Sequence, residues 1–379
     1  MPRVNIHLYP SFFTNESRIL REARAIVDLG ISDEVILIGL WKEGLLREEI
    51  ISERIRLIRV KGLFRKRVNS SWSNIFVLIF FFFHLIAIAI RAKPFAINVH
   101  ALTMLPFAVV VAWVVRSSLI YDAHELETET HASRGFRRAF ARGVERVFIR
   151  FVDYTVVVSH SIEKWYRDEY GLSEIITIKN IPVFRNKEYV SDLKSRLGLK
   201  GYELLFVYVG LFSSGRGIDQ IIRCFRREEN KDFHVVFIGY GDMEDAIKKS
   251  VQSNIHYLPA VAPDQIAALI SGGDVGLSLI EASCLSYYYS LPNKVFEYLS
   301  AGLPFICSDF PDVKQEFAEF EVCWFSDLNG GIEEIVGRIS RQEIELKKSN
   351  VIKHRARWDW SVEKLKLIDV YRSIEKIKI

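Results

Sequence analysis

The sequence predicts an α/β protein made of two doubly wound domains. Short apolar runs rich in β-branched residues alternate with amphipathic helical stretches along the whole chain, a pattern typical of parallel sheets covered by helices. The length of 379 residues suits two domains of ordinary size. Because 49% of the residues are hydrophobic and 26% are charged, the chain can bury full cores, which excludes wholesale disorder.

The first half of the chain supplies the first predicted sheet. Strands are predicted where short apolar runs are bounded by turn residues, at 4–8, 35–40, 55–60, 96–100, 118–121, 154–159 and 175–178. Helices are predicted where apolar residues recur at helical spacing, at 16–29, 74–91, 104–115, 134–151 and 161–170. This alternation predicts a mainly parallel sheet with helices on its faces.

The second half repeats the same order. Strands are predicted at 203–209, 233–238, 255–257, 275–279, 305–308 and 323–325. Helices are predicted at 218–226, 243–250, 264–271, 293–301, 313–319 and 331–339. Apolar periodicity is lost at 181–197, so we expect a first domain at 1–185, a second at 186–359, and a final helix at 360–379 that packs back on the first. Two such domains that face each other enclose a cleft, where we expect ligands beyond the carboxyl ends of the strands.

Charge and cysteine content narrow the class of protein. The net charge of +4 is uneven: residues 51–150 hold 16 Lys and Arg against 6 Asp and Glu, and residues 191–379 hold 24 against 27. A basic first half suggests an anionic partner for it. The four cysteines form no CxxC pair, which argues against a structural zinc site and a disulfide scaffold. The N-terminus has no signal-peptide pattern, so we expect a cytoplasmic protein.

The most apolar segment, Ile75–Ile90, lies inside the basic region. Its 16 residues span about 24 Å as a helix, less than the roughly 30 Å of a membrane core, so a membrane-spanning helix is disfavoured. Two interpretations remain, a buried core helix and a helix lying in a membrane interface. The second is favoured by an aromatic and basic flank and by the arginine-rich helix that follows. The flanking residues are Arg59, Lys61, Arg65, Lys66, Arg67 and Trp72.

The segment Tyr287–Gly302 carries the sharpest local signal for a binding site. Its proline suits a first helical turn and its final glycine a helix end. Asn293 and Glu297 share a helix face, with Lys294 beside them. Free N–H groups at such a helix start, together with Lys294, form an anion site, and a carboxylate one turn further can accept ribose hydroxyls. An ordinary capped helix explains the same spacing equally well.

A second candidate is the turn after the strand at 203–209. Ser213, Ser214, Gly215 and Arg216 occupy a strand-to-helix turn, where backbone amides and an arginine can hold a diphosphate. The turn differs from a P-loop because Arg216 replaces the lysine, so nucleotide hydrolysis is excluded on this ground. A plain glycine-rich turn remains the alternative.

Further candidates follow other predicted strands. Gly239 in the FIGYGD segment permits close backbone approach, but a full GxGxxG pattern is absent, which weakens a nicotinamide-binding interpretation.

The LIYDAHEL segment places Asp122 and His124 at the end of a predicted strand, and His100 ends the preceding strand. Such imidazoles can meet a sugar or a phosphate, although acidic residues there also suit a helix start. No DxD triplet or GxSxG motif occurs, which disfavours a metal-dependent transferase and a serine hydrolase.

Together these segments resemble family 4 of the retaining glycosyltransferases, also described as glycosyl transferases group 1. The resemblance covers nearly the whole chain and is carried by YDAHEL, VVVSHSIEKWYRDEYG, VGLFSSGRGIDQII, FIGYGDMEDAI and above all SLPNKVFEYLSAGLP. It implies the GT-B fold of two facing Rossmann-like domains, with the donor in the second domain. It also implies metal-independent transfer of a sugar from a nucleotide-sugar, with retention of the anomeric configuration.

The resemblance also implies roles for individual residues. Glu297 would bind the ribose, Arg216 the diphosphate, and His124 the donor sugar, with Lys294 near the phosphates. The remaining donor-side positions are Asn293, Gly215, Ser290, Leu291, Tyr289, Gly239 and Val261, and the acceptor-side positions are His100, Glu16 and Arg18. The chain departs from the family pattern where Tyr289 replaces the first glutamate of a Glu-x7-Glu pair, where Leu211 replaces an arginine, and where the first loop lacks a glycine pair.

The expected function is therefore transfer of a hexose-type sugar from a UDP- or GDP-sugar to a lipid-linked or polysaccharide-precursor acceptor in cell-surface glycan biosynthesis. We expect no cofactor, no metal and no nucleic-acid partner, and a peripheral position on the cytoplasmic face of an anionic membrane. The alternatives are a nucleotide-sugar epimerase of the same fold and a non-catalytic nucleotide-sugar-binding subunit.

Overall fold

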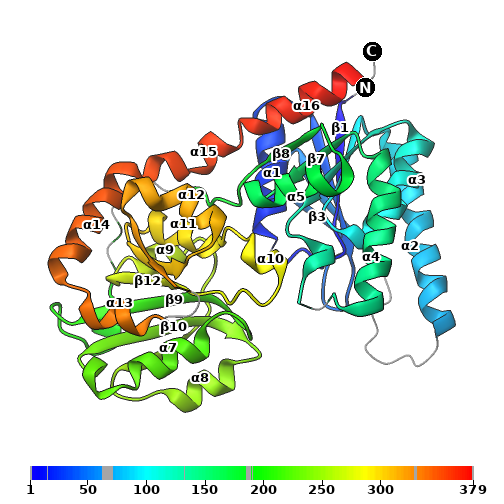
Figure 1. Cartoon of the computed structure of the whole chain (residues 1–379). Coiled ribbons are helices and arrows are strands. Elements are labelled where there is room, and N and C mark those ends of the chain that lie inside the picture. Colours follow the sequence, from blue (N-terminus) through cyan, green and yellow to red (C-terminus); the bar gives the residue numbers. More distant parts are fainter. Residues whose placement is uncertain are drawn as a thin grey trace. The chain divides into compact units, whose positions relative to one another are not determined.

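The protein folds into two compact units, residues 1–178 together with 364–379, and residues 179–363 (Figure 1). The structure is a computed structural model that describes residues 2–14, 16–61, 71–131, 133–184, 189, 191–327 and 331–377, with the side chains of residues 71–80 and 377 left out. The expected boundary between 185 and 186 lies outside the described residues, as do Arg65, Lys66, Arg67 and the side chain of Trp72. The structure instead divides the chain after Ile178 and again after Glu363.

The first unit is built on one eight-stranded sheet in the order β3-β4-β2-β1-β5-β6-β7-β8. Its strands are β1 Val4–Leu8, β2 Glu34–Leu40, β3 Glu48–Ser52, β4 Ile55–Val60, β5 Ala96–Val99, β6 Ser118–Ala123, β7 Tyr154–Val157 and β8 Ile175–Thr177. All pairings are parallel except that of β3 with β4. The strand order reverses between β1 and β5, and doubly wound sheets bind ligands beyond the carboxyl ends of such a pair. We call this position the first crevice.

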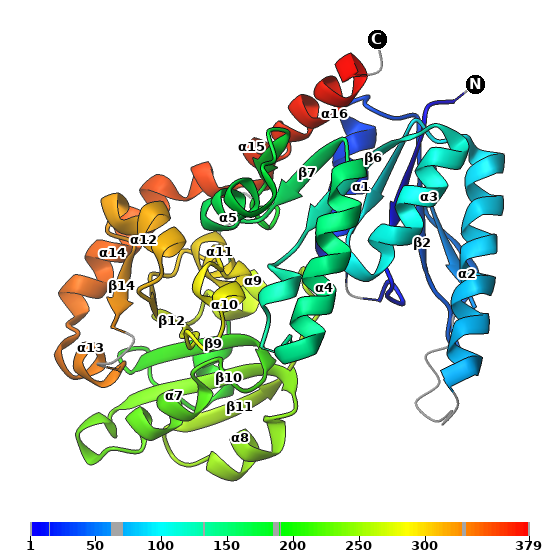
Figure 2. The ribbon, with the colours of Figure 1, turned by 45° about the vertical axis from the view of Figure 1, so that its right-hand side comes forward.

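Helices cover both faces of this sheet. They are α1 Ser17–Asp28, α2 Ser71–Ala92, α3 Leu105–Val115, α4 Gly135–Phe148, α5 His160–Tyr170 and α16 Lys366–Ile377, with short 3-10 turns at Leu102–Met104, Glu127–Glu129 and Ile149–Phe151. Figures 1 and 2 both place α2, α3 and α4 side by side. The returning helix α16 is fixed by Tyr371, whose hydroxyl donates to Asn98 Oδ1 at 2.9 Å and accepts from Asn5 Nδ2 at 2.8 Å.

The second unit is built on a six-stranded parallel sheet in the order β11-β10-β9-β12-β13-β14. Its strands are β9 Leu204–Phe212, β10 Phe233–Gly241, β11 Ile255–Pro259, β12 Val275–Ser278, β13 Phe305–Ser308 and β14 Cys323–Ser326. Its helices are α6 Leu193–Arg196, α7 Ile218–Phe225, α8 Glu244–Ser250, α9 Ile266–Ile270, α10 Leu285–Tyr288, α11 Asn293–Ser300, α12 Pro311–Phe317, α13 Glu333–Arg338, α14 Arg341–His354 and α15 Trp360–Glu363, with 3-10 turns at Glu228–Asn230, Ala318–Phe320 and Arg355–Trp358. The order reverses between β9 and β12, which marks the second crevice.

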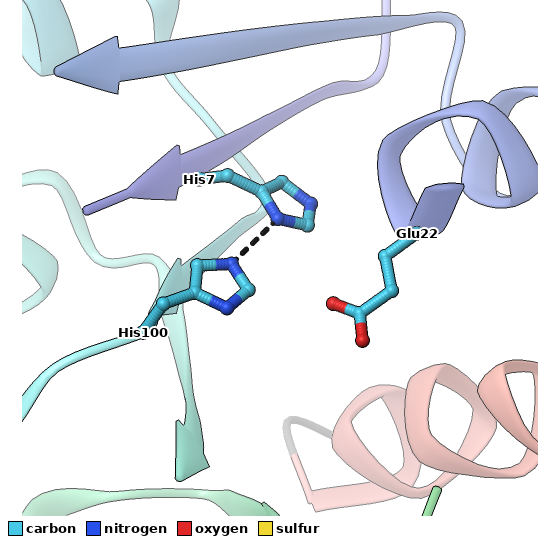
Figure 3. Close-up of side chains that lie close together, drawn as sticks. All are labelled: His7, Glu22 and His100. Atoms are coloured by element: carbon cyan, nitrogen blue, oxygen red, sulfur yellow. Dashed lines mark hydrogen bonds between the residues drawn. The ribbon is translucent and has the colours of Figure 1, made fainter. Parts of the chain in front are cut away.

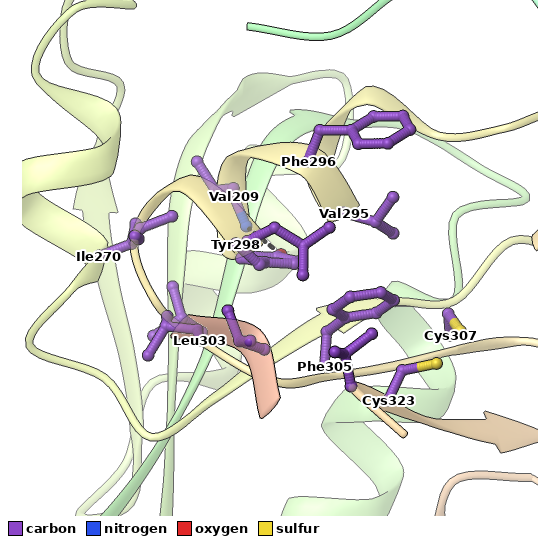
Figure 4. Close-up of a cluster of buried hydrophobic side chains, with 14 of the residues drawn as sticks. Val209, Ile270, Val295, Phe296, Tyr298, Leu303, Phe305, Cys307 and Cys323 are labelled. Atoms are coloured by element: carbon purple, nitrogen blue, oxygen red, sulfur yellow. Dashed lines mark hydrogen bonds between the residues drawn. The ribbon is translucent and has the colours of Figure 1, made fainter. Parts of the chain in front are cut away.

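One buried tyrosine locks α11 onto this crevice. The Tyr298 hydroxyl donates to the Leu277 carbonyl at 2.8 Å and accepts from the Val209 N–H at 3.2 Å, so it bridges β12 and β9 within the core (Figure 4). A side chain at Gly276 would put its Cβ 2.4 Å from the Tyr298 ring, so only glycine fits under the ring. The helix start at Asn293 is therefore held rigidly beside the strand ends.

The predicted order of strands and helices agrees with the structure, except that β3, α6, α10 and α14 were not expected. The helices α6 and α10 have four residues each, too few to show a helical period in the sequence. The edge strand β3 was not expected, because its alternating acidic sequence EEIIS is exposed at a sheet edge and lacks the apolar run of the buried strands. The helix α14 was not expected either, since few of its residues are buried and its apolar positions are sparse. The predicted final helix is divided into α15 in the second unit and α16 in the first.

Candidate functional site

A buried polar cluster lies at the first crevice. His7 on β1, His100 just after β5 and Asp122 on β6 come from neighbouring strands. His7 Nδ1 lies 2.8 Å from His100 Nε2 (Figure 3), and His100 Nδ1 lies 2.9 Å from Asp122 Oδ2. His124 Nε2 lies 3.2 Å from the same Asp122 oxygen. Asp122 therefore joins a chain of imidazoles that runs from the sheet interior to His124.

Arg18 of α1 closes this cluster from the opposite side. Its guanidinium donates to Asp122 Oδ1 at 2.9 Å and to the Ile178 carbonyl at 3.0 Å, and it lies 3.0 Å from Glu22 Oε1. Burial acts to raise the pKa of Asp122, but Arg18 and the histidines outweigh it and hold the pKa well below its ordinary value. Burial raises the pKa of Glu22 well above its ordinary value. The fixed charges are thus one guanidinium and one carboxylate.

The hydrogen bonds assign the roles of the three histidines. Burial lowers the pKa of His100 to about 4 and that of His7 well below its ordinary value, so both imidazoles are neutral. Asp122 accepts hydrogen bonds from both His100 and His124, which fixes the tautomers of both rings. His124, with 26% of its side chain exposed, is the member of the chain that can reach a ligand. His100 and Arg18 are buried and position it.

The histidines and carboxylates of this cluster are residue types that can also bind a metal ion. Two groups, His7 with Glu22 and His100, and His100 with Asp122 and His124, bring one ligand atom from each residue within 4.8 Å of the others. The Arg18 guanidinium already neutralises the Asp122 carboxylate at hydrogen-bond distance. A divalent ion would therefore add uncompensated positive charge in a buried site, which disfavours it.

The second crevice holds two cations, Lys294 and Arg216, each with a buried nitrogen atom that no described residue satisfies. Lys294 on α11 is 8% exposed, and its ammonium lies 3.6 Å from the centre of the Tyr208 ring. Among the described residues, neither Lys294 Nζ nor Arg216 Nε finds a hydrogen-bond partner, although both atoms are buried. Burial and the neighbouring Arg216 lower the pKa of Lys294 well below its ordinary value, while Glu297 acts in the opposite direction. This pair is arranged to receive a negatively charged group.

Glycines shape the backbone around these cations. Gly210 at the end of β9 has a φ of +122°, and a Cβ built there would lie 3.9 Å from Lys294 Nζ. A Cβ at Gly239 would lie 1.9 Å from the Gly210 carbonyl oxygen, so a larger residue cannot be accommodated there. Gly215 has a φ of +79° and lies under Tyr287, whose ring also contacts the Arg216 guanidinium at 5.6 Å. These glycines therefore let the backbone pass close to the two cations and to Tyr287 without a steric clash.

The other predicted donor-side residues are distributed around α10 and α11. Asn293 begins α11 and is exposed, and Glu297 lies one turn later, half-buried. Ser290 donates its hydroxyl to the Tyr287 carbonyl at 2.7 Å, and Leu291 is part of the core, so that position offers its backbone only. Two further donor-side residues are half-buried: Tyr289, just after α10, and Val261, in the loop after β11. On the first unit, the predicted acceptor-side residue Glu16 is half-buried just before α1.

Sequence reasoning missed three residues that build these sites. His7 lies in the buried strand β1, where two polar residues, Asn5 and His7, within an apolar run were the available signal. Tyr208 and Tyr287 contact the two cations of the second crevice through their ring faces. The run of three tyrosines at 287–289 signals an aromatic surface but not which ring meets which cation.

Comparisons with known proteins bear on the family and the fold of the chain. Residues 16–181 match the model of the Glycosyltransferase Family 4 domain, and residues 191–358 match that of Glycosyl transferases group 1. A teichuronic acid biosynthesis glycosyltransferase, TuaC of Bacillus subtilis, is 23% identical over 207 residues, 54% of this chain and 49% of that protein. The chitobiosyldiphosphodolichol beta-mannosyltransferase of Kluyveromyces lactis is 23% identical over 308 residues, 70% of this chain and 68% of that protein. The match thus spans about half the length of the first relative.

Solved structures share the fold over almost the whole chain. Sucrose-phosphate synthase of Thermosynechococcus elongatus has a TM-score of 0.76 at 15% identity, with 99% of this chain and 100% of that one covered. HepE of Anabaena in complex with UDP and glucose has a TM-score of 0.74 at 13% identity, with 98% and 100% covered. Within the described part of the chain, no helix combines the length and the apolarity needed to cross a bilayer. On its two family models and its GT-B fold, the chain belongs to the family 4 type of glycosyltransferases.

Proposed function

We propose that the protein is a metal-independent, retaining glycosyltransferase that moves a hexose-type sugar from a UDP- or GDP-sugar to a lipid-linked or polysaccharide-precursor acceptor. The observation that carries this proposal is the pair Lys294 and Arg216, whose Nζ and Nε atoms are buried and find no hydrogen-bond partner among the described residues. Two cations with buried, unbonded nitrogen atoms beside a glycine-lined turn match a diphosphate better than any neutral ligand.

The proposed mechanism depends on stabilising the departing diphosphate. As the bond to the sugar breaks, Lys294, Arg216 and the free N–H groups at the start of α11 take up the growing negative charge. The acceptor hydroxyl attacks on the face that the diphosphate leaves and gives its proton to a diphosphate oxygen. His124, held by Asp122, hydrogen-bonds the donor sugar, and Glu297 accepts the ribose hydroxyls.

The relatives support the substrate classes. HepE binds UDP and glucose in its solved structure, and the mannosyltransferase relative is named for a diphosphodolichol-linked acceptor. TuaC is named for teichuronic acid biosynthesis, a glycan pathway. The Arg18 guanidinium that neutralises Asp122 supports metal independence.

Donor binding and turnover test the proposal together. A thermal-shift panel with UDP, GDP, ADP and their sugars should identify the base, because a bound nucleotide raises the melting temperature by mass action. Arg216→Ala and Glu297→Ala should each lower sugar transfer at least about tenfold, a loss of about 1.4 kcal/mol in transition-state stabilisation. Binding without transfer or donor hydrolysis in the wild type would support a non-catalytic subunit instead, and inversion at a sugar carbon of the free donor would support an epimerase.

We further propose that the α2–α3–α4 face rests on an anionic membrane. Among its exposed side chains are Trp113 (80% exposed), Phe136 (85%) and Phe140 (65%), and the two phenylalanines stack on the outer face of α4. An apolar hollow of about 970 Å³ opens beside Trp113 and Phe151. Aromatic groups on a helix surface that also carries arginines match the interface of an anionic bilayer. Co-sedimentation with anionic vesicles should therefore fall as salt is raised, and absence of binding at low salt would refute this part.

A further inference from the structure

A cationic pocket of about 480 Å³ lies at the outer edge of the first sheet, between α2 and the strands β3 and β4. Five basic side chains line it, namely Arg47, Arg56, Arg59, Lys61 and Arg91. Among the described lining residues, Glu48 is the one acid. The described residues that line the pocket come from β2, β3, β4, α2 and their loops, and none comes from β1 or β5. It is therefore separate from the candidate site of this unit.

Two of the five cations already have partners. Arg59 is buried and donates to Glu49 Oε2 at 2.8 Å and to the Phe12 carbonyl at 2.8 Å, which ties β4 to the neighbouring loop. Arg56 lies 3.2 Å from Glu34 Oε2. These two residues shape the pocket and contribute little free charge to it.

Three cations remain without an ion pair. Arg47, Lys61 and Arg91 are exposed, and no salt bridge joins any of them to a described acid. Arg47 instead lies over the Trp41 ring at 5.4 Å, which orients its guanidinium. Against the single charge of Glu48, three unpaired cations leave an excess of positive charge. This excess of positive charge favours the binding of an anionic ligand.

The floor of the pocket is aliphatic. Ile36, Ile58 and Val60 from the strands and Ile88 from α2 form it. Phe83, five residues before Ile88, and Ile90, two residues after it, are exposed on the side of α2 that faces away from the pocket. An inorganic anion makes no contact with an aliphatic floor, whereas an amphiphile can place its charged group on the basic rim and its chain against that floor.

We propose that this pocket binds the phosphate headgroup of an anionic membrane lipid. The inference deepens the proposed function, since it names the lipid chemistry that the membrane face recognises. Arginine side chains suit a phosphodiester because their planar N–H groups can engage two of its oxygens at once. The lipid bound here anchors the protein and is distinct from the acceptor that reacts.

A charge-matched pair of variants tests the pocket. The double variant Arg91→Gln with Lys61→Gln removes two unpaired pocket cations, and Arg372→Gln with Lys376→Gln removes two exposed cations from α16 of the same unit. On phosphatidylcholine vesicles doped with phosphatidic acid, we expect partitioning of the pocket variant to weaken at least about tenfold and that of the α16 variant less than about twofold. Equal losses in the two variants would overturn the proposal, because they would show that net charge alone is sensed.

Soluble ligands separate a lipid site from a general anion site. Dihexanoyl phosphatidic acid, below its micelle concentration, should raise the melting temperature of the wild type but not of the pocket variant, while inorganic phosphate at equal concentration should not. An equal effect of inorganic phosphate, or no effect of the lipid, overturns the assignment. UDP binding is measured in the same samples: the pocket variant should keep it. A wild type that fails to bind UDP yet retains the vesicle contrast would refute the proposed transferase and leave the pocket standing.

Discussion

Replacing Lys294 by methionine should make the ligand-free protein more stable and the donor complex weaker. The ammonium is buried over the Tyr208 ring with no described hydrogen-bond partner. A desolvated cation–π contact returns about 2 kcal/mol, whereas an unpaired buried ion costs several kcal/mol. Methionine has a similar volume and no charge, so we expect the free energy of unfolding to rise by roughly 1–3 kcal/mol.

The same variant loses a charged contact to the diphosphate. A hydrogen bond to a charged group contributes about 1.5–3 kcal/mol, so the dissociation constant for UDP should rise roughly 10- to 150-fold. Thermal denaturation measures the first effect and isothermal titration with UDP the second. Lys353→Met, at an exposed position on α14, is the control and should change neither. Unchanged UDP affinity in the Lys294 variant would refute the anion site.

The pH dependence follows from the direction of the pKa shift. The folded-state pKa of Lys294 is lowered, and its ordinary value is 10.5. The unfolded chain therefore binds the proton more tightly, so the destabilisation is fully present below the folded pKa and is lost as pH rises toward 10.5. The stability advantage of the methionine variant should shrink over that window. An advantage that stays constant or grows with rising pH would contradict the assignment.

Three further predictions concern the first unit and metal dependence. Asp122→Asn removes the ionised partner of the buried Arg18 and should lower the free energy of unfolding by about 3–5 kcal/mol, whereas His124→Ala should reduce transfer at least about tenfold with little change in a urea melt. Equal destabilisation by both would contradict the positioning role of Asp122. Burial raises the pKa of Glu127 from 4.5 to about 8, so the folded state holds this proton more tightly than the unfolded chain does. The free energy of unfolding of the wild type should therefore fall as pH rises from about 4.5 to 8, and that of Glu127→Gln should fall less. Parallel curves of stability against pH for the two proteins would contradict this prediction. Prolonged EDTA treatment should leave donor binding and transfer unchanged, and recovery of lost activity by added Mg²⁺ or Mn²⁺ would refute metal independence.

The strand-to-loop junctions are the part of the site that the sequence predicts well. Asp122 and His124 follow an apolar run whose end is visible in the pattern, and the structure places both at the carboxyl end of β6. Arg18 illustrates the limit. It lies in an amphipathic helix, where an arginine is expected on the solvent face, yet it is buried against a carboxylate 104 positions later. The role of Arg18 follows from the packing of α1 against β6 in the folded protein, which the sequence pattern does not reveal.

The basic composition of residues 51–150 is a further case in which the structure changes the meaning of a sequence feature. Arg59 points inward and ties a loop to the sheet, while Arg138 and Arg142 both bind the buried carboxylate of Glu129. Much of the local positive charge is therefore used within the fold and is not available to a partner. Lys61 and Arg91, which form no salt bridge with an acid among the described residues, line the pocket between α2 and β4 together with Arg47. Pairing, more than the count of charges, decides where an anionic surface can bind.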